Sequence, residues 1–193
     1  MVAFPLLVKR YSVDDLACFP QDGKLRELVD GQIVEWPVPT YRQSFFLLTI
    51  GAEVRRFARE HRLGQVGGGD GMVRVHGSEF DARGADVAFY QRGRRPTDLD
   101  AAATVVVPDF VVEVLSPTDR ADMVLDKVHD WLRAGVRLLW YVNPETGTTT
   151  VYSGDRIGHV APDDALNGGD VLPGFQLRIR DILAELDEDE AQP

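Results

Sequence analysis

The sequence predicts an α/β protein built on a mixed β-sheet, and three observations support this. Strand-like runs at 72–75, 86–90 and 110–115 follow one another closely enough to pair as antiparallel neighbours. A helical segment over 119–134 then leads to a fourth, almost wholly apolar strand at 136–143. A helical crossover between neighbouring strands favours parallel pairing. The predicted core order is therefore helix, three strands, helix, strand, with the helices packed on the sheet.

The N-terminal part contains two local signatures. Ser12–Asp15 resembles a capping box, with Asp in place of Glu, and opens a short helix through about Phe19. Asp30-Gly31 separates two strand-like runs, and this dipeptide is a strong signature of a two-residue hairpin turn. We expect a β-hairpin here.

A long helix is predicted next, from a cap at Thr40 to about Arg62. Its apolar residues recur at three- and four-residue steps, which indicates one buried face. These residues are Phe46, Ile50, Val54, Phe57 and Ala58. The glycine-rich segment 64–71 that follows is predicted to be flexible, and it lacks the Gly-Lys-Ser/Thr of a phosphate-binding loop.

The C-terminal part is predicted to form a small hairpin and a short helix that are added to the core. Gly135 suits the exit of the helix over 119–134. Segments 148–152 and 158–161 are typical of a small hairpin appendage, and a short helix is expected over 182–186. We expect one domain over residues 1–186 and a disordered acidic tail over 187–193.

Bulk composition indicates an ordinary globular protein. The chain has 193 residues, of which 44% are hydrophobic and 27% charged. No apolar run reaches the roughly 20 residues that a membrane-spanning helix needs, and the N-terminus lacks the pattern of a secretory signal. Cys18 is the single cysteine, which excludes an internal disulfide and a cysteine metal cluster. A cytoplasmic location is expected.

The net charge of the chain is unfavourable for nucleic-acid binding, but two segments are locally basic. With 21 basic and 31 acidic residues the net charge is −10, whereas affinity for phosphates comes largely from Lys and Arg. Arginines nevertheless cluster in two segments, and the local field matters more than the sum. These segments contain Arg55, Arg56, Arg59 and Arg62, and then Arg92, Arg94 and Arg95.

Two carboxylates occupy strands where a charge is costly. Glu113 lies in the middle of the apolar strand 110–115, and Asp86 begins the strand before it. A buried ionised carboxylate must be paired, protonated or bound to a cation. Mg²⁺ or Mn²⁺ would suit two acids that converge from neighbouring strands. The alternative is a buried ion pair, with Arg83 as the obvious partner.

Lys127 strengthens the metal-site interpretation. On the helix over 119–134 it lies at three- and four-residue steps from Val124 and Trp131, which places it beside the apolar stripe. A lysine there can lay its stem along the core and direct its ammonium toward the sheet. The alternative is that the ammonium extends into solvent.

Several short motifs occur in a specific order and spacing between about Tyr11 and Leu183. They are Arg26–Gly31, Arg83–Val87, Val112–Pro117, Asp126-Lys127, Ala134–Val136, Leu139–Val142 and Pro173–Phe175. In this order and spacing they resemble the Uma-two family of restriction-endonuclease-like proteins within the PD-(D/E)XK nuclease superfamily.

The resemblance implies a restriction-endonuclease-like fold and a set of site residues. It implies that Asp86 and Glu113 are the metal-binding acids and that Glu27 completes the metal site. Leu115 stands where the superfamily usually has lysine, and Lys127 matches a lysine that has moved to the following helix. The sequence departs from the family at Ala85, usually proline, and near residues 42–43, where a histidine is often found.

The predicted function is a Mg²⁺- or Mn²⁺-dependent endonuclease that acts on nucleic acid, with DNA favoured over RNA. The protein is expected to be a homodimer. Asp86, Glu113, Lys127 and Glu27 are the predicted catalytic residues. Substrate contacts are expected from Arg83, Arg92, Arg94 and Arg95. Two alternatives remain: a non-catalytic nucleic-acid-binding or regulatory protein that keeps the nuclease fold, and a metal-dependent hydrolase of a smaller phosphoester.

Overall fold

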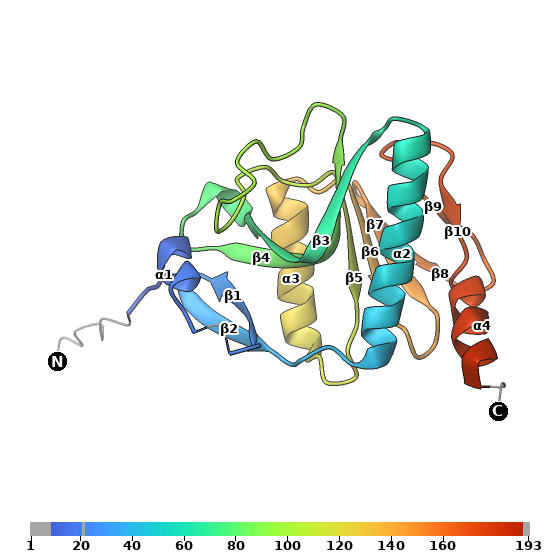
Figure 1. Cartoon of the computed structure of the whole chain (residues 1–193), viewed down its shortest axis with the longest axis horizontal. Coiled ribbons are helices and arrows are strands. Elements are labelled where there is room, and N and C mark those ends of the chain that lie inside the picture. Colours follow the sequence, from blue (N-terminus) through green and yellow to red (C-terminus); the bar gives the residue numbers. More distant parts are fainter. Residues whose placement is uncertain (1–8, 21, 191–193) are drawn as a thin grey trace.

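The structure, a computed structural model, describes residues 9–20 and 22–190. Its strands are β1 (Leu25–Val29), β2 (Gln32–Trp36), β3 (Gly64–Arg74), β4 (Ala82–Gln91), β5 (Phe110–Val114), β6 (Leu138–Val142), β7 (Thr149–Ser153), β8 (Arg156–Val160), β9 (Leu166–Asn167) and β10 (Gln176–Leu177). Eight of them form one mixed sheet in the order β2-β1-β4-β5-β6-β7-β8, with β3 paired to β4 (Figure 1).

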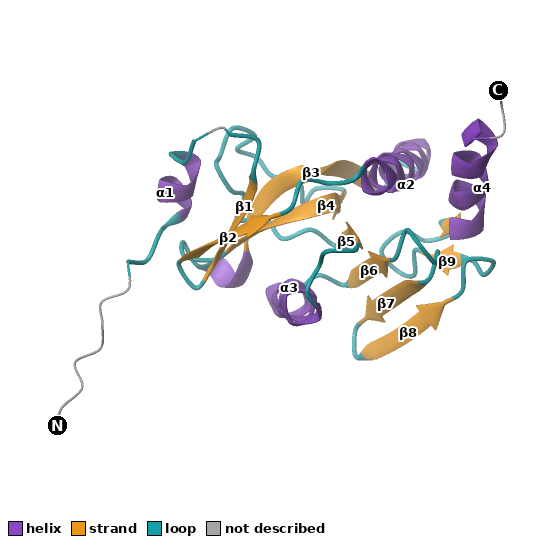
Figure 2. Cartoon of the chain, turned by 90° about the horizontal axis from the view of Figure 1, so that it is seen from below, coloured by secondary structure: helices purple, strands orange, loops and turns teal. Residues whose placement is uncertain are grey.

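The helices cover both faces of this sheet. They are α1 (Val13–Ala17), α2 (Tyr41–Glu60), α3 (Ala121–Ala134) and α4 (Ile179–Glu190). Figure 2 shows α2 and α4 on one side of the sheet and α3 on the other. Each side therefore has its own apolar core, with Phe46 and Ile50 of α2 on one side and Trp131 of α3 on the other. In the described part of the chain, no helix combines the length and apolarity that crossing a membrane requires.

The predicted order of the central elements is confirmed. Strands β3, β4 and β5 are antiparallel neighbours, and β5 pairs with β6 in parallel after the crossover through α3. The local signatures hold as well: Ser12 and Thr40 both form capping boxes. Asp30 and Gly31 turn the hairpin with φ angles of 47° and 74°, the left-handed region that this turn requires.

The glycine-rich segment is not the flexible loop that the sequence predicts. It forms most of β3 and pairs with β4, with a bulge between Gly68 and Gly71. At Gly68 a Cβ atom would stand 2.3 Å from the carbonyl oxygen of Asp86. The glycines therefore permit a close backbone approach beside a predicted site residue, which is a known use of glycine inside a strand.

Two C-terminal expectations also change. The hairpin β7–β8 is not an appendage, because β7 pairs with β6 along its length and extends the main sheet. The last helix is longer than predicted and includes the acidic residues 187–190, which were expected in a disordered tail. The rest of that predicted tail, residues 191–193, lies outside the described residues.

One edge of β4 changes partners partway along its length. This edge pairs with β1 at Ala82 and with β5 at residues 87–89. Between them, residues 83–86 form no ladder on this edge within the described chain, while β3 still pairs along the opposite edge. The sheet therefore opens between β1 and β5, and Asp86 lies in this opening.

Candidate active site

A cavity of about 370 Å³ occupies the opening in the sheet. The β1–β2 hairpin, the start of α2, strands β4 and β5, and α3 all contribute to its wall. The four predicted catalytic residues border it, namely Glu27, Asp86, Glu113 and Lys127. The fold therefore gathers into one cavity residues that are far apart in the sequence.

Asp86 and Glu113 stand opposite each other on neighbouring strands. The antiparallel ladder of β4 and β5 ends at the pair Val87–Val112, so Asp86 and Glu113 each lie one residue beyond its last pair, on opposite strands. Residues directly opposite in such a ladder share one face of the sheet. Here the Asp86 side chain accepts a hydrogen bond of 2.7 Å from the backbone N–H of Val114. A carboxylate thus replaces a backbone acceptor where the two strands separate.

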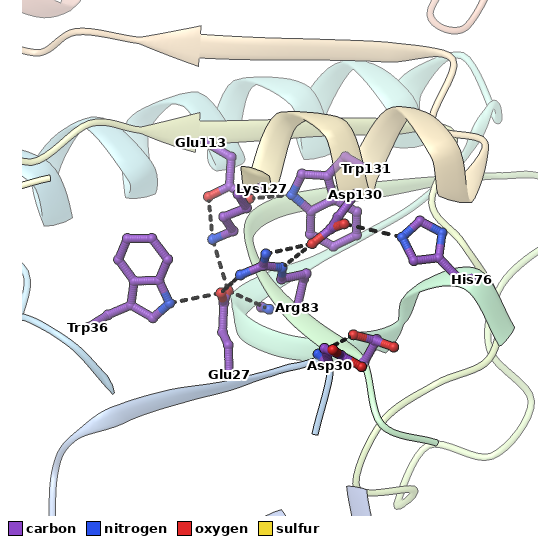
Figure 3. A network of polar contacts seen from close by, with 11 residues as sticks. Glu27, Asp30, Trp36, His76, Arg83, Glu113, Lys127, Asp130 and Trp131 are labelled. Carbon is purple, nitrogen blue, oxygen red and sulfur yellow. Dashed lines mark hydrogen bonds and ion pairs between the residues drawn. The ribbon is translucent and has the colours of Figure 1, made fainter. Parts of the chain in front are cut away.

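Lys127 reaches the sheet from α3 and lies between two carboxylates (Figure 3). Its Nζ is 2.9 Å from Oε2 of Glu113 and 3.0 Å from Oε1 of Glu27. Burial alone would lower the pKa of Lys127, but the charges of Glu113 and Glu27 outweigh it and hold that pKa well above the usual value. The ammonium is therefore protonated at neutral pH.

Glu27 is surrounded by donors rather than left open to a cation. Its Oε1 accepts from the backbone N–H of Gly84 at 2.9 Å and faces Lys127. Its Oε2 accepts from Nε1 of Trp36 at 2.8 Å and from Arg83 at 3.0 Å. Two donors on each oxygen use the acceptor capacity of a carboxylate. This geometry gives Glu27 the role of an anchor for Lys127, and it does not support the expected role as a metal ligand.

Arg83 belongs to the framework of the site. Its side chain is 3% exposed, and its Nε donates to Asp130 at 2.8 Å while its other end holds Glu27. His76 contacts the second oxygen of Asp130 at 3.2 Å (Figure 3). From the sequence, Arg83 was expected either to pair with the carboxylates on the strands or to contact the substrate. It pairs with Glu27, and its burial between two carboxylates leaves it out of reach of a substrate.

The charges at this site favour a cation. The network has four carboxylates, of Glu27, Asp86, Glu113 and Asp130, and two positive groups, of Lys127 and Arg83. Two negative charges are left over if all six groups are ionised. Burial raises the pKa of Glu113 to about 8, and Asp86 and Glu27 contribute to the rise against the effect of Lys127.

A hard divalent cation would balance this excess, and carboxylate oxygens are its preferred ligands. Asp86 and Glu113 fit that role, because they face each other in the cavity. The predicted third ligand does not join them. Within residues 9–20 and 22–190, no three His, Cys, Asp or Glu side chains are grouped closely enough to enclose a metal ion.

Tyr141 is a cavity residue that the sequence analysis missed. It lies beside Glu113 in the parallel register of β5 and β6 and borders the same cavity. Its hydroxyl group is buried and has no hydrogen-bond partner among the described residues. Burial, followed by the charge of Glu113, raises its pKa well above 10, so the phenol keeps its proton. In the apolar run 138–142 a tyrosine is indistinguishable from core, so only the strand register reveals it.

The three arginines after β4 are not at this cavity. Arg94 pairs with buried Asp109 at 2.8 Å, whereas Arg92 and Arg95 border a separate cavity. Six residues of extended chain separate Asp86 from Arg92, which is about 20 Å at 3.3 Å per residue. The expected contacts of these arginines with a substrate therefore require a ligand that extends well beyond the carboxylates.

Comparison with known proteins agrees with this fold. The sequence model of the Uma2 family, described as "Putative restriction endonuclease", matches residues 13–180. No curated protein matches the chain. A crystal structure described as "a putative nuclease belonging to DUF820" from Anabaena variabilis ATCC 29413 superposes with a TM-score of 0.79 at 18% sequence identity. The match covers 91% of this chain and 98% of that one, and it shows a shared fold.

Proposed function

The chain belongs to the Uma2 family, and from that premise we propose that it is a divalent-metal-dependent endonuclease that hydrolyses phosphodiester bonds in nucleic acid, with DNA as the favoured substrate. One observation carries this proposal. Asp86 and Glu113 face each other in a single cavity, next to a protonated Lys127 and with an excess of negative charge.

The residues divide the chemistry between them. In phosphodiester hydrolysis a water oxygen forms a bond to phosphorus, the bond to one sugar oxygen breaks, and that oxygen leaves with a proton. A divalent cation held by Asp86 and Glu113 would lower the pKa of bound water and polarise the phosphoryl oxygen. Lys127 carries its proton at neutral pH, so it would stabilise negative charge in the transition state rather than act as a base. Glu27 would hold Lys127 in position.

The same proposal includes a homodimer in the cytoplasm. Cutting both strands of a duplex requires two sites, and twofold dimers are the commonest closed assemblies. The free, exposed Cys18 is compatible with a reducing compartment. Sedimentation at high protein concentration tests the dimer, because a species of only 21.5 kDa would contradict it.

A second candidate is a nucleic-acid-binding protein that has the nuclease fold but no catalysis. Two observations favour it. Lys127 already pairs with both Glu113 and Glu27, so the charge of the cavity is partly balanced without a metal ion. The whole chain is acidic, at −10, which is unfavourable for an enzyme that must hold a polyanion.

A cleavage assay with Mg²⁺ or Mn²⁺ on supercoiled plasmid, single-stranded DNA and RNA tests the proposal. The parent protein should nick or cut one of these substrates, and Asp86→Asn should reduce the rate about a hundredfold or more, the cost of losing a central electrostatic group. Asp155→Asn, at the exposed β7–β8 turn, is the matched control and should cleave like the parent.

Thermal unfolding with the same ions distinguishes the two candidates. An enzyme of the proposed kind should be stabilised by millimolar Mn²⁺, and Asp86→Asn should abolish the stabilisation. A protein that binds DNA in EDTA, does not respond to either ion and cleaves nothing would support the non-catalytic candidate.

A further inference from the structure

Five arginines surround a second cavity, away from the carboxylates. This cavity of about 820 Å³ lies between the end of α2, the start of β3 and the loop that follows β4. Its neutral lining includes Gln65, Tyr90, Gln91 and Thr97, and no carboxylate of the described chain borders it. The arginines, here called the arginine cluster, are Arg55, Arg59, Arg62, Arg92 and Arg95.

The arginine cluster is not neutralised by neighbours. Other arginines close by are paired, Arg56 with Glu53 and Glu60, and Arg94 with Asp109. Within the described residues none of the five cluster arginines takes part in an ion pair. Five unpaired positive charges therefore stand together on a protein with an overall charge of −10.

Backbone contacts hold this arrangement together. The N–H of Arg92 donates to the carbonyl of Leu63 at 2.7 Å, and the N–H of Leu63 donates to Ala58 at 2.9 Å. Arg62 has a φ angle of 55°, a left-handed conformation that is uncommon for arginine. These contacts fix the loop after β4 against the end of α2 and bring two arginine segments, far apart in the sequence, to the same cavity.

We propose that the arginine cluster binds the phosphate backbone of the nucleic acid that is cleaved at the Asp86 cavity, an inference that rests on the proposed function. Guanidinium groups match phosphate oxygens with two parallel hydrogen bonds, and phosphates supply the negative charge that the cluster lacks. Contacts of this kind position a duplex without reading its sequence.

The distance between the cavities fits an extended ligand. The helix α2 links them, because Gln43 near its start borders the carboxylate cavity and Arg59 near its end borders the arginine cavity. Sixteen residues separate the two, about 24 Å at 1.5 Å per residue. In Figure 1 the chain enters α2 at the bottom of the view and leaves it at the top. That span corresponds to about seven base pairs of duplex at 3.4 Å each.

Binding in EDTA tests the arginine cluster without any need for catalysis. The variant Arg59→Gln/Arg92→Gln is compared with Arg156→Gln/Arg180→Gln, which changes the net charge equally on elements away from both cavities. A fluorescent 16-base-pair duplex is titrated at several salt concentrations. The cluster variant should bind at least tenfold more weakly, and its log–log salt slope should be shallower by about two. The control variant should bind like the parent protein.

Each result supports or overturns the inference. Equal affinity and equal salt slope for the cluster variant and the parent, with both proteins folded by thermal unfolding, would overturn it. So would loss of inorganic-phosphate binding in the cluster variant with duplex affinity unchanged, because the cluster would then serve a small anion. A parent that cleaves nothing in Mn²⁺ but shows the predicted loss of duplex affinity would refute the nuclease and leave the phosphate contact standing.

Discussion

At the scale of single residues, Lys127 links the stability of the fold to the proposed catalysis. Its ammonium lies between Glu113 and Glu27, and all three side chains are buried. Removing one partner of a buried ionic group leaves uncompensated charge. Lys127→Met should therefore lower the free energy of unfolding by roughly 3–5 kcal/mol and also remove cleavage. Chemical denaturation and single-turnover cleavage measure the two effects.

A double variant separates these two effects. In Lys127→Met/Glu27→Gln one of the stranded carboxylates becomes neutral, so much of the lost stability should return while the cleavage rate stays about a hundredfold below the parent rate. Lys9→Met is the control, since Lys9 does not border the carboxylate cavity. Recovery of both stability and rate in the double variant would show that Lys127 has only a structural role.

The Tyr141 hydroxyl allows a test of the proposed site in which stability and cleavage are easily separated, because the hydroxyl makes no hydrogen bond within the described chain. Its oxygen has no hydrogen-bond partner among the described residues, so Tyr141→Phe should leave the free energy of unfolding within about 0.5 kcal/mol of the parent value. If the phenol donates to substrate or water in the cavity, the rate should fall about tenfold or more. Tyr152→Phe, on β7, is the control. Parent-like cleavage by Tyr141→Phe would remove the phenol from the proposed site.

The sequence identified those site residues whose charge is unusual for the apolar segment that contains them. Glu113 was visible as a charge in an apolar strand, and Lys127 as a cation beside an apolar stripe. The resemblance to a family supplied Glu27, but not its surroundings. Its partners Trp36, Gly84 and Arg83 come from β2 and β4, and only the folded chain shows that they fill its acceptor positions.

At the scale of elements, the bulge of β3 positions the first carboxylate. Gly68 packs against the carbonyl of Asp86, so a Cβ there would collide with backbone rather than with a flexible side chain. Gly68→Ala should cost about 2 kcal/mol of stability. Displacement of Asp86 by about 1 Å would lower cleavage up to a hundredfold. Thermal unfolding and single-turnover cleavage check the two parts.

The same strand provides the control for this prediction. At Gly67 an added Cβ meets no atom within 4 Å, and its φ is not in the left-handed region, so Gly67→Ala should be tolerated. Equal stability and equal cleavage for the two alanine variants would show that the bulge has no influence on Asp86.

Local chemistry explains which elements were predictable. Caps and turns depend on neighbouring residues, so the capping boxes at Ser12 and Thr40 and the Asp30-Gly31 turn could be identified. The glycine-rich first part of β3, residues 64–71, could not be identified as a strand, because its glycines carry no apolar alternation and its stability comes from pairing with β4. Likewise, nothing within the β7–β8 hairpin indicates that β6 is its neighbour in the sheet.

On the scale of the whole molecule, the carboxylate cavity and the arginine cluster lie at opposite ends of α2. The basic residues that border the carboxylate cavity, Lys24, Arg26 and Lys127, are paired with acids, whereas the arginine cluster is unpaired within the described chain. The net charge of −10 therefore says little about where a polyanion would bind. It does predict that association with nucleic acid depends strongly on salt, since attraction is local and the remaining surface repels phosphate.

The stability of the whole molecule should also depend on pH through Glu113. Burial raises the pKa of this residue to about 8 in the folded chain, above its ordinary value of 4.5. The folded state then holds a proton that the unfolded state releases, so this contribution to stability is complete below about pH 4.5 and is lost as pH rises toward 8.

Glu113→Gln isolates this contribution, because glutamine does not titrate. In EDTA, the parent should lose several kcal/mol of unfolding free energy relative to Glu113→Gln as the pH rises from 5 to 8. Urea denaturation at a series of pH values measures it. Addition of Mn²⁺ should reduce the decline, since a cation beside Asp86 and Glu113 supplies the charge that the ionised carboxylate lacks. A difference that is constant across this pH range would mean that Glu113 is ionised throughout, with Lys127 alone sufficient to balance it.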